Sequence, residues 1–198
     1  MNICVFGAAS PKVDQKYVDA VERLGEALAK RGHQLIFGGG MYGLMGAAAR
    51  GAKKGGAKVT GVMPRFFLEK KIEPVFEDCD ELIMTQSMSE RKDIMEELSD
   101  AFIIAPGGIG TFEEFFQMLV LKQLDQHNKP IAIYNVSGFY FGIEALMHNG
   151  AEESFLRDNT LKLYKTFDAE NLDEMLDYIE TDEETKHMHV EDLFYIMN

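Results

Sequence analysis

Short apolar runs alternate with longer amphipathic stretches along most of the chain. Runs of this kind are typical of the buried strands of a parallel sheet. They predict strands at Asn2–Phe6, Gln34–Phe37, Ala57–Met63, Ala101–Ala105 and Pro130–Tyr134, with Leu161–Phe167 as a last strand.

The stretches between these runs carry apolar residues near the 3.6-residue period of a helix. The first, Asp14–Arg31, is the clearest, and Gly32 follows it as a C-cap. The other predicted helices are Gly43–Lys54, Gln86–Ser99, Phe112–Leu124, Phe139–Asn149, Ala151–Asn159 and Asn171–Ile179. Residues Arg65–Leu82 are mixed and charged, and they predict no definite element.

Alternating strands and helices indicate an α/β fold: a doubly wound, Rossmann-like parallel sheet with helices on both faces. We expect one domain over residues 1–180 and a helical acidic tail over residues 181–198. Ligands of such sheets bind outside the carboxyl ends of the strands. The glycine-containing loops at Gly7, Gly38 and Gly107 should therefore meet at that edge.

The net charge of -13 is concentrated at the end of the chain. Residues 168–198 hold eleven acidic residues and one lysine, so ten of the thirteen negative charges lie there. This distribution argues against nucleic-acid binding. No apolar run approaches the roughly 18 residues of a membrane span, and two cysteines form no disulfide framework. We therefore expect a cytoplasmic protein without a membrane segment.

The loop after the fourth predicted strand has the chemistry of an anion site. Ala105–Glu114 reads A-P-G-G-I-G-T-F-E-E and passes from a buried strand into a helix. Glycines let the backbone approach a ligand, and the free N–H groups of a helix start attract phosphate. Glu114 has two interpretations: with Thr111 as N-cap it completes a T-x-x-E capping box, or it acts on a bound ligand.

Gly38–Gly43 satisfies G-x-G-x-x-G between a strand and a helix, which by itself suggests a dinucleotide site. The motif follows the second strand rather than the first, and no acid ends the next strand to hold a ribose. We favour a tight, glycine-lined wall of a smaller pocket.

Arg91 is the one charge on an apolar helix stripe formed with Met88, Met95 and Leu98. It has no carboxylate three or four residues away, whereas Lys92 can pair with Glu96. An inward arginine needs a distant acid or an anionic ligand, so a core salt bridge and a ligand contact both remain open. His187-Met188-His189 lacks a third metal ligand and is interpreted as surface.

These residues resemble the Lonely Guy (LOG) family of nucleoside-monophosphate phosphoribohydrolases, whose members are often labelled lysine decarboxylases. The family pattern P-G-G-x-G-T-x-x-E is met from Pro106 to Glu114, and its Arg-Lys pair by Arg91-Lys92. The glycine stretch Gly38–Gly46 is also similar to that of the family. The resemblance covers about Asn2 to Leu156.

The resemblance implies hydrolysis of the N-glycosidic bond of an adenine-type nucleoside 5′-monophosphate by a homodimer. We expect the reaction to need no cofactor or metal. The resemblance also implies that Arg91 and Glu114 are catalytic. The implied substrate-binding residues are Gly39, Met88, Lys92, Gly107, Gly108, Ile109, Gly110, Thr111, Phe112 and Glu113.

The chain departs from the family at Ser89, where members often carry His, and at Leu119–Leu121, where they often carry Trp. These departures bear on which base is preferred. A nucleotide carrier without turnover is the alternative function, and an NAD-dependent enzyme is disfavoured by the missing acid.

Overall fold

The computed structural model describes residues 1–157 and 159–181. Its seven strands form one parallel sheet in the order β4-β3-β2-β1-β5-β6-β7, which confirms the predicted doubly wound α/β fold. The strands are β1 (Asn2–Phe6), β2 (Gln34–Phe37), β3 (Val59–Pro64), β4 (Glu81–Thr85), β5 (Ala101–Ile104), β6 (Ile131–Asn135) and β7 (Lys165–Asp168).

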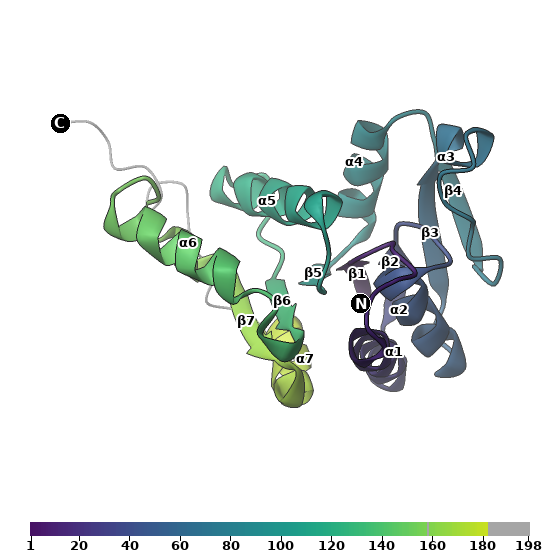
Figure 1. Cartoon of the computed structure of the whole chain (residues 1–198), viewed down its shortest axis with the longest axis horizontal. Coiled ribbons are helices and arrows are strands. Elements are labelled where there is room, and N and C mark those ends of the chain that lie inside the picture. The colour runs from purple at the N-terminus through teal and green to yellow at the C-terminus, as the bar shows by residue number, and fades with distance from the viewer. Residues whose placement is uncertain (158, 182–198) are drawn as a thin grey trace.

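Helices cover both faces of the sheet (Figure 1). Helices α1 (Gln15–Lys30), α2 (Gly43–Lys54) and α7 (Leu172–Thr181) pack on one face. Helices α4 (Met88–Leu98), α5 (Ile109–Gln123) and α6 (Phe141–Glu152) pack on the other, and the short α3 (Arg65–Glu69) follows β3. Within the described residues no helix has the length and apolar character that a bilayer span requires.

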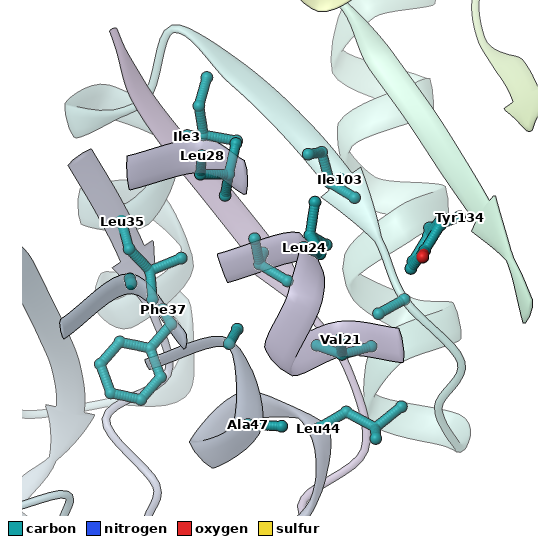
Figure 2. Packing of buried hydrophobic residues seen from close by; sticks show 14 of the residues in the cluster. Ile3, Val21, Leu24, Leu28, Leu35, Phe37, Leu44, Ala47, Ile103 and Tyr134 are labelled. Carbon is teal, nitrogen blue, oxygen red and sulfur yellow. The ribbon is translucent and has the colours of Figure 1, made fainter. Parts of the chain in front are cut away.

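The core is apolar because the central strands, such as β1, β3, β5 and β6, are covered on both faces. Figure 2 shows Val21, Leu24 and Leu28 of α1 lying over the strand residues Ile3 and Ile103, all fully buried. The small residues of α2 allow a close contact with α1. A Cβ on Gly25 of α1 would lie 2.3 Å from the carbonyl oxygen of Ala48, so the two helices can approach closely.

Two parts of the sequence prediction are wrong. Ala151–Asn159 is not a second helix, because α6 ends at Glu152 and the chain turns back, with the N–H groups of Phe155 and Leu156 donating to the carbonyl of Gly150. The last strand starts only at Lys165, after a short 3-10 turn at Thr160–Lys162.

The uncertain stretch Arg65–Leu82 contains α3 and leads into β4. This strand lies at the edge of the sheet with Glu81 and Leu82 exposed, so it lacks the continuous apolar run that marks a buried strand. The predicted tail lies outside the described residues except for Thr181, which ends α7, and so does His187-Met188-His189.

Candidate active site

The three glycine-containing loops meet at the carboxyl edge of the sheet, as the sequence predicts. The N–H of Ala8 donates to the carbonyl of Pro106 at 3.0 Å, and the N–H of Leu44 donates to the carbonyl of Ala8 at 2.7 Å. A cavity of about 350 Å³ lies at this junction. Its walls are formed by Gly7, Ala8, Ala9, Ser10, Met45, Phe67, Glu73, Met88, Arg91, Gly108, Gly110, Thr111, Glu113 and Glu114.

Helix α5 begins at Ile109, with Gly108 as its N-cap in extended backbone. The predicted start at Phe112 is therefore wrong, and so is the capping-box interpretation of Thr111 and Glu114. Thr111 already lies in the first turn, and Glu114 lies one turn further on. The first N–H groups of a helix have no carbonyl partner within it, so those of Ile109, Gly110 and Thr111 are available to an anion.

Arg91 of α4 lines the cavity and is 4% exposed. Its Nε donates to the carbonyl oxygen of Val62 at 3.0 Å, and its Nη1 lies 3.4 Å from Oε1 of Glu114. The salt-bridge interpretation of Arg91 is thus confirmed, and the ligand contact stays a prediction. Arg91 forms a buried ion pair with a distant acid, and that pair lines the cavity.

Two glycines of the G-x-G-x-x-G stretch leave space that charged side chains fill. A Cβ on Gly38 would lie 1.9 Å from Nη2 of Arg91, and a Cβ on Gly40 would lie 1.9 Å from Oε1 of Glu73. The motif here makes room for the site's own arginine and carboxyl group. The glycines themselves are not among the lining residues, so the expected glycine-lined wall is wrong: they lie behind the side chains that form the wall.

Glu73 is the site residue that sequence reasoning missed. The chain segment around it pairs with the glycine loop, since the N–H of Met41 donates to the carbonyl of Pro74 and that of Phe76 to the carbonyl of Gly39, both at 2.9 Å. This pairing turns Glu73 into the cavity, where it is 8% exposed. Among the described residues, its buried Oε1 has no hydrogen-bond partner.

Two of the three glutamates that line the cavity, Glu73 and Glu114, have strongly altered acidity. Burial raises the pKa of Glu114 to about 7, although Arg91 opposes the rise. Burial also raises the pKa of Glu73 to about 7, again against the attraction of Arg91. The two groups therefore change protonation near neutral pH, so the site can hold an acid and a base at the same time.

These acidities predict how stability depends on pH. The folded protein keeps protons on Glu73 and Glu114 up to a pKa of about 7, whereas the unfolded chain loses them near the ordinary value of 4.5. The folded state binds more protons in this interval, so the free energy of unfolding should fall as pH rises through it. Denaturant titrations across the interval should show a shallower fall for Glu73→Gln, and parallel curves would contradict the assignment.

The close approach of Arg91 to Gly38 predicts the effect of a substitution at Gly38. Gly38→Ala should lower kcat/KM by about 100-fold, because the new methyl group displaces the Arg91 guanidinium from its place. The fold should persist, since the displaced atoms are the ends of two flexible side chains, Arg91 and Met45. Gly142→Ala is the matched control, as a Cβ there meets no atom within 4 Å. Equal activity of the two variants would contradict the prediction.

The remaining predicted substrate residues divide between the cavity and its surroundings. Met88, Gly108, Gly110, Thr111 and Glu113 line the cavity. Others lie beside it: Lys92 forms an ion pair with Glu113, Ile109 is 82% exposed, Phe112 packs against Phe139 and Tyr140, and Gly107 borders a neighbouring cavity. Gly39 is not among the lining residues. It has a φ of 80°, and a Cβ there would contact Met63.

Ser10 and Phe67 are further lining residues that the sequence did not single out. Ser10 lies in the loop after β1, and Phe67 lies on α3, inside the stretch that predicted no element. A parallel sheet whose carboxyl edge holds a helix start with free N–H groups and a buried arginine defines a Rossmann-like α/β protein with a candidate ligand site at that edge.

Comparison with known proteins gives the family. A family model described as "Possible lysine decarboxylase" matches residues 45–181. The "Probable cytokinin riboside 5'-monophosphate phosphoribohydrolase LOGL1" of Oryza sativa subsp. japonica is 39% identical over 156 residues, 79% of this chain and 69% of that protein. The Arabidopsis thaliana "Cytokinin riboside 5'-monophosphate phosphoribohydrolase LOG2" is 34% identical over 90% of this chain and 82% of its own length. The chain belongs to this family, the LOG family.

The matches to four rice relatives span between 61% and 69% of those proteins. Among solved structures, the molybdenum cofactor carrier protein of Chlamydomonas reinhardtii has a TM-score of 0.67 and 21% identity, over 90% of this chain and 97% of that one. The molybdenum cofactor binding protein of Rippkaea orientalis has a TM-score of 0.63 and 23% identity, over 91% and 96%. At this identity the two structures establish the shared fold.

Proposed function

We propose that this chain hydrolyses the N-glycosidic bond of an adenine or N6-substituted adenine nucleoside 5′-monophosphate, releasing the free base and ribose 5-phosphate. The observation that carries the proposal is the buried Arg91–Glu114 pair, which lines the same cavity as the start of α5. The names of the plant relatives support the substrate class and the reaction.

The phosphate is assigned to the start of α5. The first-turn N–H groups there are positive and unpaired within the helix, and the glycine at position 110 lets an oxyanion come close to the backbone. Thr111 adds a hydroxyl in the cavity wall. Lys92 forms an ion pair with Glu113, which lines the same cavity. The ammonium group of Lys92 can attract the phosphate.

The sugar then lies over the two carboxyl groups and Arg91. Cleavage of the bond between C1′ and the base leaves oxocarbenium character on the ribose, which the carboxylate of Glu114 stabilises. Water attacks C1′ and gives up its proton to a carboxylate, while the departing base takes a proton from the acid form of a cavity carboxyl. Glu73 and Glu114 both titrate near neutral pH, so the pair can supply both forms.

Some apolar side chains of the cavity wall come from helices other than α5. Met88 begins α4 and Phe67 lies on α3. We assign the base to these two residues, because a flat aromatic ring packs well on thioether and aromatic surface. The cavity of about 350 Å³ is in the size range of small-ligand sites.

The test is incubation of the protein with AMP and with an N6-substituted AMP, followed by chromatography of the free base and assay of ribose 5-phosphate. Release of both products in equal amounts supports the proposal. Saturable nucleotide binding without any base release supports the carrier function instead. Absence of release from every purine and pyrimidine monophosphate would refute hydrolysis.

We also propose that the protein acts as a homodimer. Large apolar side chains are exposed on or beside α5 and α6, which pack on the same face of the sheet: Ile109, Val120, Leu124, Phe141, Leu146 and Phe155. An exposed apolar patch of this kind marks an interface between proteins. Light scattering should give twice the chain mass for the native protein and a lower mass for Val120→Glu. If Val120→Glu remains a dimer, the interface lies elsewhere on the protein.

A further inference from the structure

A second cavity, of about 250 Å³, adjoins the first. It lies between the loop after β1 and the loop after β5, which are neighbouring strands whose following helices cover opposite faces of the sheet. The strand order reverses at this point, and such a crevice is where doubly wound proteins hold ligands. The two cavities share Ala8, Ser10 and Gly108 as lining residues.

The wall of the second cavity is mostly apolar and partly aromatic. The rings of Tyr17 and Phe139 meet edge to face, with centroids 6.2 Å apart. Val13, Leu44 and Pro106 add aliphatic surface. This composition suits an uncharged, flat group.

The charged side chain of the wall disfavours a second phosphate, although Lys16 Nζ lies 4.9 Å from the centroid of the lining Tyr17 ring. Asp14 is the one charged residue among the described lining residues, and neither lysine nor arginine is among them. Asp14 holds its place as the N-cap of α1, where its Oδ1 accepts the N–H of Lys16 at 3.0 Å. A carboxylate in the wall repels an additional phosphate but accepts a hydroxyl group.

Gly108 is the link between the two cavities. It is the N-cap of α5, so the phosphate assigned to that helix start lies at the wall that the cavities share. A group attached to the phosphate on the side away from the ribose would therefore enter the second cavity.

We propose that the second cavity binds an uncharged aromatic or nucleoside-like group esterified to the nucleotide phosphate, so that the protein recognises nucleoside 5′-phosphodiesters in addition to monoesters. This inference rests on the proposed function, because it uses the phosphate position assigned there. In such a phosphodiester, the base and ribose would occupy the first cavity. The other group esterified to the phosphate would occupy the second cavity.

Calorimetric titration of the full chain with three ligands tests the proposal: AMP, its phenyl ester and its methyl ester. The two esters carry the same charge and differ only in the group that the cavity would hold. The phenyl ester should bind at least about tenfold tighter than the methyl ester. In Val13→Phe, whose larger side chain fills the cavity, this preference should disappear while AMP binds as in the native protein. Phe139→Ala should weaken the phenyl ester alone.

Equal binding of the two esters to the native protein would overturn the inference, and so would a preference that survives in Val13→Phe. Binding of neither ester would overturn it as well. These outcomes are separate from the base-release assay. A protein that releases base from AMP but does not distinguish the esters keeps the proposed function and loses the second subsite.

Discussion

Glu114→Gln is expected to leave a folded protein whose turnover of AMP is lower by a factor of roughly 10² to 10⁴. The amide keeps the shape of the carboxyl group and still offers an oxygen to Nη1 of Arg91, now 3.4 Å from Oε1. It can neither carry the negative charge that an oxocarbenium-like transition state requires nor act as a general acid or base near neutral pH. Single-turnover kinetics and a denaturant titration would measure the two effects separately.

The structure sharpens this test, because Glu114 lies beyond the first turn of α5 and does not cap it. A loss of activity therefore cannot come from a lost helix cap. Glu97→Gln is the matched control, since Glu97 is exposed on α4 and takes no part in the cavity. If Glu114→Gln retains native turnover, Glu114 serves only to pair with Arg91, and the proposed chemistry is wrong.

Arg91→Met is expected to lower kcat/KM by at least about 100-fold. The methionine fills most of the space of the arginine stem but removes the cation that lies against Glu114 and the donor to the carbonyl of Val62. Without Arg91 the pKa values of Glu73 and Glu114 should rise further, because the arginine now opposes the effect of burial on both. The two carboxyl groups then stay protonated at neutral pH, so neither of them can act as the general base.

The higher pKa values of Glu73 and Glu114 should also change how the stability of Arg91→Met depends on pH. Protonated carboxyl groups are compatible with burial, so Arg91→Met should remain folded at acidic pH and lose stability more steeply than the native protein as pH rises. Denaturant midpoints at several pH values would show it. Arg50→Met removes an arginine whose pair with Glu22 is partly exposed, and it should have little effect. An Arg91→Met chain that is unfolded even in acid would mean that Arg91 serves mainly the fold.

The sequence by itself determined the fold class and the anion-binding loop. Continuous apolar runs such as Ala101–Ile104 predict buried parallel strands because both faces of each strand must be covered. The glycine loop before α5 is local as well, since a strand that breaks into glycines and restarts as a helix always leaves free N–H groups at the break. The resemblance carried by Pro106–Glu114 and Arg91-Lys92 then predicted the family, which the comparisons confirm.

Only the tertiary structure decided which charged groups share the cavity. Nothing local to Arg91 reveals Glu114 as its partner, because the two lie on different helices and meet through the packing of α4 and α5 against one face. The residues next to Glu73 in the sequence give even less indication that it belongs to the site. Its burial depends on the pairing of residues 74–76 with the glycine loop and on the empty space at Gly40.

The start of α5 shows the same division. T-x-x-E chemistry favours a cap at Thr111, yet the helix begins three residues earlier, with Gly108 as an N-cap that makes no side-chain hydrogen bond. Local patterns depend on neighbours along the chain, whereas burial, acidity and the position of a charge depend on neighbours in space. For this reason the sequence determined where the ligand edge lies, and the tertiary structure decided that two carboxyl groups and one arginine lie there together.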